Sequence, residues 1–285
     1  MKVFRAHLEE VFREAAARWT LLAYFALTTL FIILFAATVN LDVVNGALAG
    51  ARLFGNDVQM DRHPVMINKF VAGVDMGISG MLFMFGTVLG LLATAHLMPR
   101  MLEKGTVDLF LSRPAARVRV LLIRYLSGLI LIGANLVYLF GAYQLIMFSK
   151  TGVIRGELWL AAGTIFFSLA VLIAFQFLIG VLSGSSTVSL MAGFAVFVFG
   201  LILQFHKEIS AALSSAWAAG LIDAIYWVLP KTGEMLRGTV IQVAAGQLGP
   251  GGPPAPDYFV TFSTTAIFGF VCLALSAWLF HRRDF

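Results

Sequence analysis

The most charged stretch of this otherwise apolar chain is a short segment, EKGTVDLFLSRPAARVRVLLIRYL, which starts at Glu103. Glu103 and Asp108 offer carboxylate acceptors, and Arg113 and Arg117 offer forked guanidinium donors that bind a carboxylate through two hydrogen bonds. Pro114 interrupts a helix through the segment, because proline has no backbone N–H. These residue types suit polar contacts with a partner protein, although the arginines alone would also fix membrane orientation and bind anionic lipid headgroups.

Other arrangements of reactive residues are lacking in the sequence. Cys272 is the only cysteine, which excludes an intrachain disulfide and a cysteine-based metal site, and the five histidines do not have metal-ligand spacing. There is no carboxylate pair and no Ser-His-Asp set legible from spacing. The glycine-rich GVLSGSST at 180–187 lacks the lysine of a nucleotide-binding loop. We therefore expect no catalysis, no metal or cofactor held by this chain, and no nucleotide hydrolysis.

The composition is that of a protein with many membrane crossings. Hydrophobic residues make up 60% of the 285 residues, charged residues only 12%, and the mean hydropathy is +0.90. The formal charge of +5 could suggest nucleic-acid binding. However, no polar domain carries a basic stripe with interleaved aromatic residues, and positive charge beside apolar segments is explained by membrane topology.

Six segments without a charged residue are long enough to cross a bilayer, which takes about 20 apolar residues. The uncharged run 158–205 is too long for one crossing, and SGSST at 183–187 divides it with a tight turn. We therefore expect an all-α polytopic membrane protein, a single transmembrane domain over 1–285. Its six transmembrane helices are expected at 19–39, 76–98, 125–148, 158–182, 188–205 and 258–280.

The positions of lysine and arginine predict the orientation. If both termini lie on one side, that side holds twelve of the twenty basic residues in the shorter length of chain. Because cytoplasmic loops carry this excess, both termini are expected to be cytoplasmic. Residues 1–18 have apolar positions at helical spacing, so an N-terminal interfacial helix is expected there, lying in the headgroup region or packed on another subunit.

The expected outer side has two longer loops, 40–75 and 206–257. The stretch at 209–229 is apolar enough to be a seventh span, but Asp223 would then cost up to about 2.5–3.5 kcal/mol in hydrocarbon. A seventh span would also move the C-terminus outside. We therefore expect a re-entrant or interfacial helix in this outer loop.

The six expected spans contain no Asp, Glu, Lys or Arg. A carrier coupled to protons or ions usually needs such a buried relay, so secondary transport is disfavoured. The remaining polar groups could line a pathway or hydrogen-bond between helices, and the second role is the more common. They are Asn135, Tyr138, Tyr143, Gln144, Gln176 and Gln204.

The charged segment follows an ordered pattern, E-x-G-T-x-D-x-x-L-S-R-P-x-x-R, between the second and third expected spans. In this setting the sequence resembles the permease subunits of ABC transporters of the ABC-2 type, in the branch that includes permeases for multicopper-enzyme maturation. The resemblance also covers the expected six spans, the short hairpin between the fourth and fifth, and the terminal Arg-Arg-Asp. The matching residues are Glu103, Gly105, Thr106, Asp108, Leu111, Ser112, Arg113, Pro114 and Arg117.

The resemblance implies a permease dimer, with a second copy or a similar permease, docked on two cytosolic ABC ATPase subunits in a bacterial cytoplasmic (inner) membrane. ATP and Mg would be bound by the ATPases, and the complex would export a substrate or extract it from the bilayer. Residues 99–124 would form the cytoplasmic coupling helix. Two other functions stay open, a scaffold or regulatory subunit of a larger complex and an ion-coupled secondary transporter. The expected ATPase contacts are Glu103, Gly105, Thr106, Asp108, Ser112, Arg113, Pro114 and Arg117.

Overall fold

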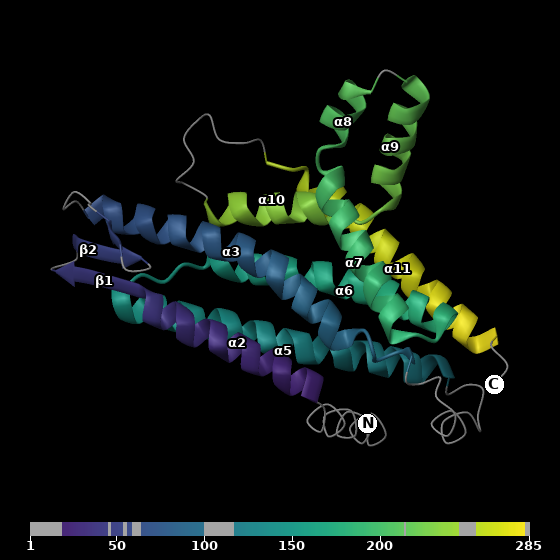
Figure 1. Ribbon diagram of the computed structural model, residues 1–285, viewed down its shortest axis with the longest axis horizontal. Coiled ribbons are helices and arrows are strands. Elements are labelled where there is room, and N and C mark those ends of the chain that lie inside the picture. Colours follow the sequence, from purple (N-terminus) through teal and green to yellow (C-terminus); the bar gives the residue numbers. More distant parts are fainter. Residues whose placement is uncertain are drawn as a thin grey trace.

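The chain folds into an elongated helix bundle, seen in Figure 1. The computed structural model describes residues 19–44, 47–53, 56–58, 64–99, 117–213, 215–244 and 255–282. The helices are α2 (Trp19–Thr38), α3 (Pro64–Thr94), α5 (Arg117–Thr151), α6 (Glu157–Ser183), α7 (Ser186–Leu203), α8 (His206–Ala212), α9 (Ala216–Val228), α10 (Thr232–Val243) and α11 (Tyr258–Arg282). The strands are β1 (Val39–Val44), β2 (Ala47–Leu53) and β3 (Asn56–Val58).

Five helices in the described part of the chain are long and apolar enough to cross a membrane. The apolar stretches are Val71–Thr94 in α3, Val118–Thr151 in α5, and the whole of α6, α7 and α11. They overlap five of the six expected spans. The remaining expected span, 19–39, coincides with α2, whose apolar stretch Leu22–Thr38 is shorter. A helical multi-pass membrane protein is therefore confirmed, with five candidate spans among the described residues.

A tight hairpin joins α6 to α7. Gly184 adopts a left-handed conformation, with φ of 65°, and its N–H donates to the Gly180 carbonyl. Glycine populates this region without steric cost, so α6 ends here. The Ser185 hydroxyl then accepts from the Val188 N–H at 3.4 Å and caps the start of α7. The chain thus reverses direction within a few residues, and α7 packs against α6.

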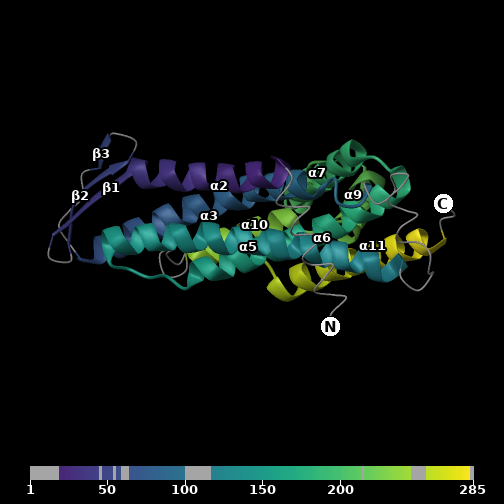
Figure 2. The same cartoon turned by 90° about the horizontal axis from the view of Figure 1, so that it is seen from below.

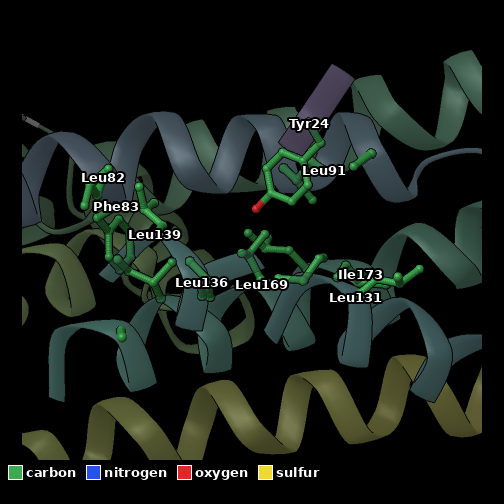
Figure 3. Packing of buried hydrophobic residues seen from close by; sticks show 14 of the residues in the cluster. Tyr24, Leu82, Phe83, Leu91, Leu131, Leu136, Leu139, Leu169 and Ile173 are labelled. Carbon is green, nitrogen blue, oxygen red and sulfur yellow. The ribbon is translucent and has the colours of Figure 1, made fainter. Parts of the chain in front are cut away.

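The centre of the bundle is α6, which contacts α3, α5, α7, α10 and α11. Ile165, Leu169 and Ile173 of α6 are fully buried. They belong to one cluster with Leu91 of α3 and Leu131 of α5, and Figure 3 shows its packing. Because lipid tails are as apolar as these side chains, close van der Waals packing rather than water exclusion holds such helices together in a bilayer.

The expected outer loop 40–75 contains regular structure. The strands β1, β2 and β3 form an antiparallel sheet in that order, and Figure 2 shows it at the opposite end of the molecule from the end of α11. The described bundle is helical as expected, and this small sheet in the loop was not predicted. The sequence of β1, VNLDVV, is rich in β-branched valine, and Asn-Gly, a pair that favours two-residue hairpins, stands between β1 and β2 in the sequence. The following helix α3 already begins at Pro64, since proline suits the first helical turn.

The outer stretch 206–257 contains three helices among its described residues. The candidate seventh span, 209–229, is divided between α8 and α9, and Leu213 between them is extended. With 13 residues α9 is about 20 Å long, shorter than the roughly 30 Å of hydrocarbon in a bilayer. Figure 1 shows α8 and α9 projecting together from the side of the bundle, whereas α10 lies along it. The third helix, α10, packs on α3 and α6.

Candidate functional site

The residues expected to contact an ATPase lie almost entirely outside the described part of the chain. Arg117 is the first residue of α5. The other seven are outside the described residues: Glu103, Gly105, Thr106, Asp108, Ser112, Arg113 and Pro114. The coupling surface therefore stays a prediction.

The flank that precedes this segment is described, and it packs closely on α5 and α6. After α3 the chain turns against α6, where a Cβ at Gly180 would lie 3.0 Å from the Met98 Cβ. Leu97 in the same turn packs against α5, where a Cβ at Gly128 would lie 2.7 Å from the Leu97 Cδ1. The segment thus leaves the bundle beside the α6–α7 hairpin and rejoins it at Arg117, the start of α5, at the same end of the bundle (Figure 1). We call this the inner end, and the opposite ends of the spans the outer ends.

A buried polar contact connects α3 to α6 near the inner end. Gln176 is 2% exposed, its amide nitrogen donates to the Leu91 carbonyl at 3.1 Å, and its amide oxygen accepts from the Thr94 hydroxyl at 3.0 Å. Gly193 of α7 lies directly against it, since a Cβ there would be 2.8 Å from the Gln176 Cγ. The role of hydrogen bonding between helices is therefore confirmed for Gln176.

Two polar contacts connect α2 to α5. The Thr28 hydroxyl donates to the amide oxygen of Asn135 at 3.0 Å. The hydroxyls of Thr29 and Tyr138 lie 3.2 Å apart, within hydrogen-bond distance. Asn135 is fully buried and its amide nitrogen has no hydrogen-bond partner among the described residues. These contacts hold the short helix α2 on the bundle, so Asn135 and Tyr138 also serve between helices.

The most unusual site is an ionic cluster around Asp75 at the outer part of α3. Asp75 is 1% exposed, and its Oδ1 accepts from the Tyr143 hydroxyl of α5 at 2.6 Å. The Arg155 guanidinium, between α5 and α6, lies 3.6 Å from the Asp75 Oδ2 and 3.6 Å from a Glu157 oxygen. It also donates to the carbonyl of Val243 in α10 at 2.9 Å. Arg155 thus connects α3, α6 and α10 to the loop between α5 and α6.

Asp75 corrects the prediction that the spans contain no ionisable residue. The apolar stretch of α3 begins at Val71, so it includes Asp75, which was assigned to the preceding loop. The helix continues through the carboxylate because Tyr143 and Arg155 provide a hydrogen bond and an opposite charge. A signal was present in the sequence, since Asp75 is next to the expected span that starts at Met76. Nothing in the spacing indicated its partners.

Gln144 lies beside the ionic cluster. Its amide nitrogen donates to the Arg155 carbonyl at 3.2 Å, and its amide oxygen accepts from the Trp159 indole N–H at 2.7 Å. It therefore fixes the connection between α5 and α6. Gln204, in contrast, directly follows α7 and donates to the Leu201 carbonyl of that helix.

A pocket of about 720 Å³ opens where α7 ends and α11 begins, and α8, α9 and α10 form its other walls. Gln204 and His206 contribute to its lining. The charged groups around it are Lys207, Glu208, Asp223, Glu234, Arg237 and Asp257. We call it the outer pocket. In the described ranges, no group of three or more His, Cys, Asp or Glu is placed to hold a metal ion.

One wall of the outer pocket is a network around Tyr226. The Tyr226 hydroxyl donates a short hydrogen bond to Glu234, whose other oxygen accepts from Thr261 at 2.5 Å. The His206 ring stacks on Tyr226 at 3.7 Å between centroids, and the Lys231 ammonium lies 4.0 Å from the same centroid. The two groups must occupy opposite faces, because both lie too close to the ring to share one.

Burial shifts the pKa values of this wall. Burial raises the pKa of the Tyr226 hydroxyl, and the hydrogen bond to Glu234 raises it further. Burial lowers the pKa of the Lys231 ammonium, while the charges of Glu234 and Asp257 act in the opposite direction. Lys231 also lies 4.2 Å from the Trp227 ring centroid, so aromatic faces take the place of a carboxylate partner.

Comparison with known proteins adds one match. The family model described as "ABC-2 family transporter protein" matches residues 11–285. It therefore covers the described bundle, the expected coupling segment and the outer helices. No curated protein matches the chain.

Proposed function

The chain belongs to the ABC-2 family of transporters, and from this premise we propose that it is the permease subunit of an ATP-driven exporter. The observation that carries the proposal is the family match over 11–285 of a chain whose described helices form a multi-pass membrane bundle. A membrane component of an ABC transporter follows from the family. Export from a bacterial cytoplasmic membrane, a single transmembrane domain over 1–285 and the branch of multicopper-enzyme maturation are our proposals.

ATP would be hydrolysed outside this chain, by two cytosolic ABC ATPase subunits that also hold Mg. In the proposed complex, two permeases pair, either as copies or as similar chains, and residues 99–124 of each dock on an ATPase. The contacts would be made by the carboxylates of Glu103 and Asp108 and the guanidinium groups of Arg113 and Arg117. Closure of the ATPases on ATP would then shift this segment and bias the bundle between inward-facing and outward-facing states.

Packing beside the segment supports this mechanism. Leu97 lies against Gly128 of α5, and Thr94 is hydrogen-bonded to Gln176 of α6. A displacement of the segment would therefore move α3, α5 and α6 together. At their outer ends the same three helices meet at Arg155. The bundle would move as a semi-rigid unit, with its motion expressed at neighbouring helices.

Charge reversal within the segment tests the proposal. Asp108→Arg and Arg113→Glu should each reduce co-purification of the ATPase and its stimulation severalfold, while membrane insertion survives. Arg119→Glu is the matched control, because Arg119 is exposed, close in sequence and outside the pattern. If the arginines only bind headgroups or set topology, Arg119→Glu should act like Arg113→Glu. Normal ATPase recovery with both segment variants would refute the docking assignment.

The buried Asp75 favours a second candidate, an ion-coupled carrier. Carboxylates within membrane helices recur in proton relays, and Asp75 is buried with Tyr143 and Arg155 as its partners. Transport by such a carrier would persist after ATP depletion and collapse with an uncoupler. Transport by an ATP-driven exporter would stop after ATP depletion and would persist with an uncoupler while ATP is supplied. Asp75→Asn separates the two further, because it would abolish coupling in a carrier but would act on an exporter through stability alone.

A further inference from the structure

We propose that the outer pocket binds the headgroup of a zwitterionic phospholipid, with the phosphate at Arg237 and the ammonium at the carboxylates of Glu208, Asp223 and Asp257. The proposal goes beyond the permease function and does not depend on it, because binding can be measured without an ATPase. It rests on four features: the position of the pocket along α7, a guanidinium whose Nε has no hydrogen-bond partner among the described residues, separated acids, and exposed apolar side chains around them.

The pocket lies where a lipid headgroup would be. With 18 residues α7 is about 27 Å long, close to the roughly 30 Å of hydrocarbon. Since its inner end is at the α6–α7 hairpin, Leu203 at its outer end reaches the opposite membrane surface. Gln204 and His206, which line the pocket, follow directly. The volume of about 720 Å³ is within the range of small-ligand sites.

Arg237 provides the anion end. It is half-buried, and its Nε is shielded from solvent without a hydrogen-bond partner among the described residues. The acid one turn earlier on α10, Glu234, forms no ion pair with it within 4.0 Å among the described residues, and the Glu234 oxygens accept from Tyr226 and Thr261. A buried N–H without an acceptor is unfavourable, and a phosphate matches the fork of a guanidinium.

Three carboxylates provide the cation end. Glu208 of α8, Asp223 of α9 and Asp257 before α11 are all exposed and line the pocket. Asp223 accepts from Ser210 at 3.3 Å and Asp257 from the Val260 N–H at 3.2 Å, each through one oxygen, so acceptor capacity is left.

The charges of opposite sign in the pocket do not neutralise each other. Within the described residues, the ion pairs closer than 4.0 Å join Arg155 to Asp75 and Glu157, outside the pocket. Lys207 and Arg237 therefore share the pocket with four acids at greater distance, of which Glu234 is already hydrogen-bonded to Tyr226 and Thr261. A ligand that carries both an anionic and a cationic group could satisfy both sets.

Apolar side chains beside the pocket favour a lipid over a soluble zwitterion. Trp227 and Val228 at the end of α9 are 58% and 66% exposed, and Trp217 at its start is 78% exposed. Phe259, next to the lining residue Val260, is 82% exposed. Tryptophan is favoured at membrane interfaces, and these side chains would border the acyl chains of a lipid whose headgroup fills the pocket.

Native mass spectrometry of the full chain in detergent tests the proposal with three probes. Dioleoylphosphatidylethanolamine should bind at least tenfold more tightly than dioleoylphosphatidylglycerol, which has the phosphate but no ammonium. Soluble phosphoethanolamine should compete with the first lipid only weakly, because it lacks acyl chains. Equal binding of the two lipids would overturn the proposal. If phosphoethanolamine displaces the lipid when both are present at the same concentration, the ligand is not a lipid and the assignment is overturned.

Variants distinguish the two ends of the ligand. Arg237→Gln should weaken the binding of both lipids about tenfold, since each carries a phosphate. Glu208→Gln should weaken only phosphatidylethanolamine, and it keeps the proposal testable if Arg237→Gln does not fold, because Glu208 is exposed. Arg119→Gln at the inner end is the control and should change neither lipid. Unchanged phosphatidylethanolamine binding in Glu208→Gln would refute the ammonium site.

Discussion

A single side chain, Arg155, connects the outer ends of several helices. It contacts Asp75 of α3, Glu157 of α6 and the Val243 carbonyl of α10, and Tyr143 of α5 completes the cluster. Such an ion pair is costly to form because both charges lose water, but removal of one partner leaves the other charge buried and unpaired. Removal of one partner should therefore lower the free energy of unfolding by more than the intact cluster contributes to it.

We predict that Asp75→Asn lowers the free energy of unfolding by about 3 kcal/mol, the lower end of the range for a broken buried ion pair. Arg155 keeps its other two partners, which limits the loss. Tyr143→Phe removes one hydrogen bond to a charged acceptor and should cost about 1.5 kcal/mol. Unfolding of the purified chain by increasing SDS in mixed micelles measures both changes.

The control for this pair is Ser149→Ala, which removes an exposed hydroxyl that bonds only within α5. It should change the free energy of unfolding by less than about 0.5 kcal/mol. If Asp75→Asn unfolds at the same SDS fraction as Ser149→Ala, the ionic cluster does not stabilise the bundle.

The sequence predicted the kind of role that buried polar residues play better than it predicted their partners. Hydrogen bonding between helices holds for Gln176, Asn135 and Tyr138. Their partners lie 82 to 109 residues away along the chain, and helical periodicity carries no information about which face meets which. The same reason hid the link from Asp75 to Tyr143, 68 residues away.

At the scale of elements, α7 and α10 approach almost to backbone contact. A Cβ at Gly200 of α7 would lie 2.1 Å from the Thr232 Oγ1 and 2.8 Å from the Pro230 carbonyl oxygen. A Cβ at Gly233 of α10 would lie 2.7 Å from the Gly200 carbonyl oxygen. The Thr232 hydroxyl uses this closeness to donate to the Phe197 carbonyl at 3.0 Å. The two glycines thus fix where α10 starts against the bundle.

We predict that Gly200→Ala destabilises the chain by about 1–3 kcal/mol, because the backbone of Pro230 cannot yield as a side chain would. Gly163→Ala in α6 is the matched control, since its Cβ would meet nothing within 4 Å. It should be neutral or stabilising by up to about 1 kcal/mol, as in other helix interiors. Thermal unfolding in detergent compares the two, and equal midpoints would show that α7 and α10 are not in contact.

Element prediction from the sequence succeeded where apolar length dominates and failed where short polar patterns decide. All six expected apolar runs coincide with helices, five of them long enough to be candidate spans, because about 20 uncharged apolar residues leave few alternatives. The sheet of β1–β3 was missed because its strands are short and lie in a loop whose composition is mixed. The start of α3 at Pro64 was missed because Lys69 and Asp75 ended the apolar run.

For the whole molecule, the length of α5 links the expected coupling segment to the outer ionic cluster. Its 35 residues extend about 52 Å, well beyond the hydrocarbon thickness of about 30 Å. Its first residue, Arg117, lies within the segment, and Tyr143 toward its other end contacts Asp75. A displacement at the inner end can therefore reach the outer end through one continuous helix.

The direction of this link depends on the orientation of the chain, which single cysteines test. In a Cys272→Ala background, Ser215→Cys before α9 and Arg119→Cys in α5 place a thiol at exposed positions, one in the expected outer stretch 206–257 and one on the expected cytoplasmic side. Because the basic residues accumulate on the side of Arg119, that side should face the cytoplasm. A membrane-impermeant maleimide should therefore label Ser215→Cys in intact cells and Arg119→Cys only after the membrane is disrupted. The Cys272→Ala parent should remain unlabelled in both conditions. Labelling of Arg119→Cys in intact cells would place the expected coupling segment outside and rule out its contact with a cytosolic ATPase.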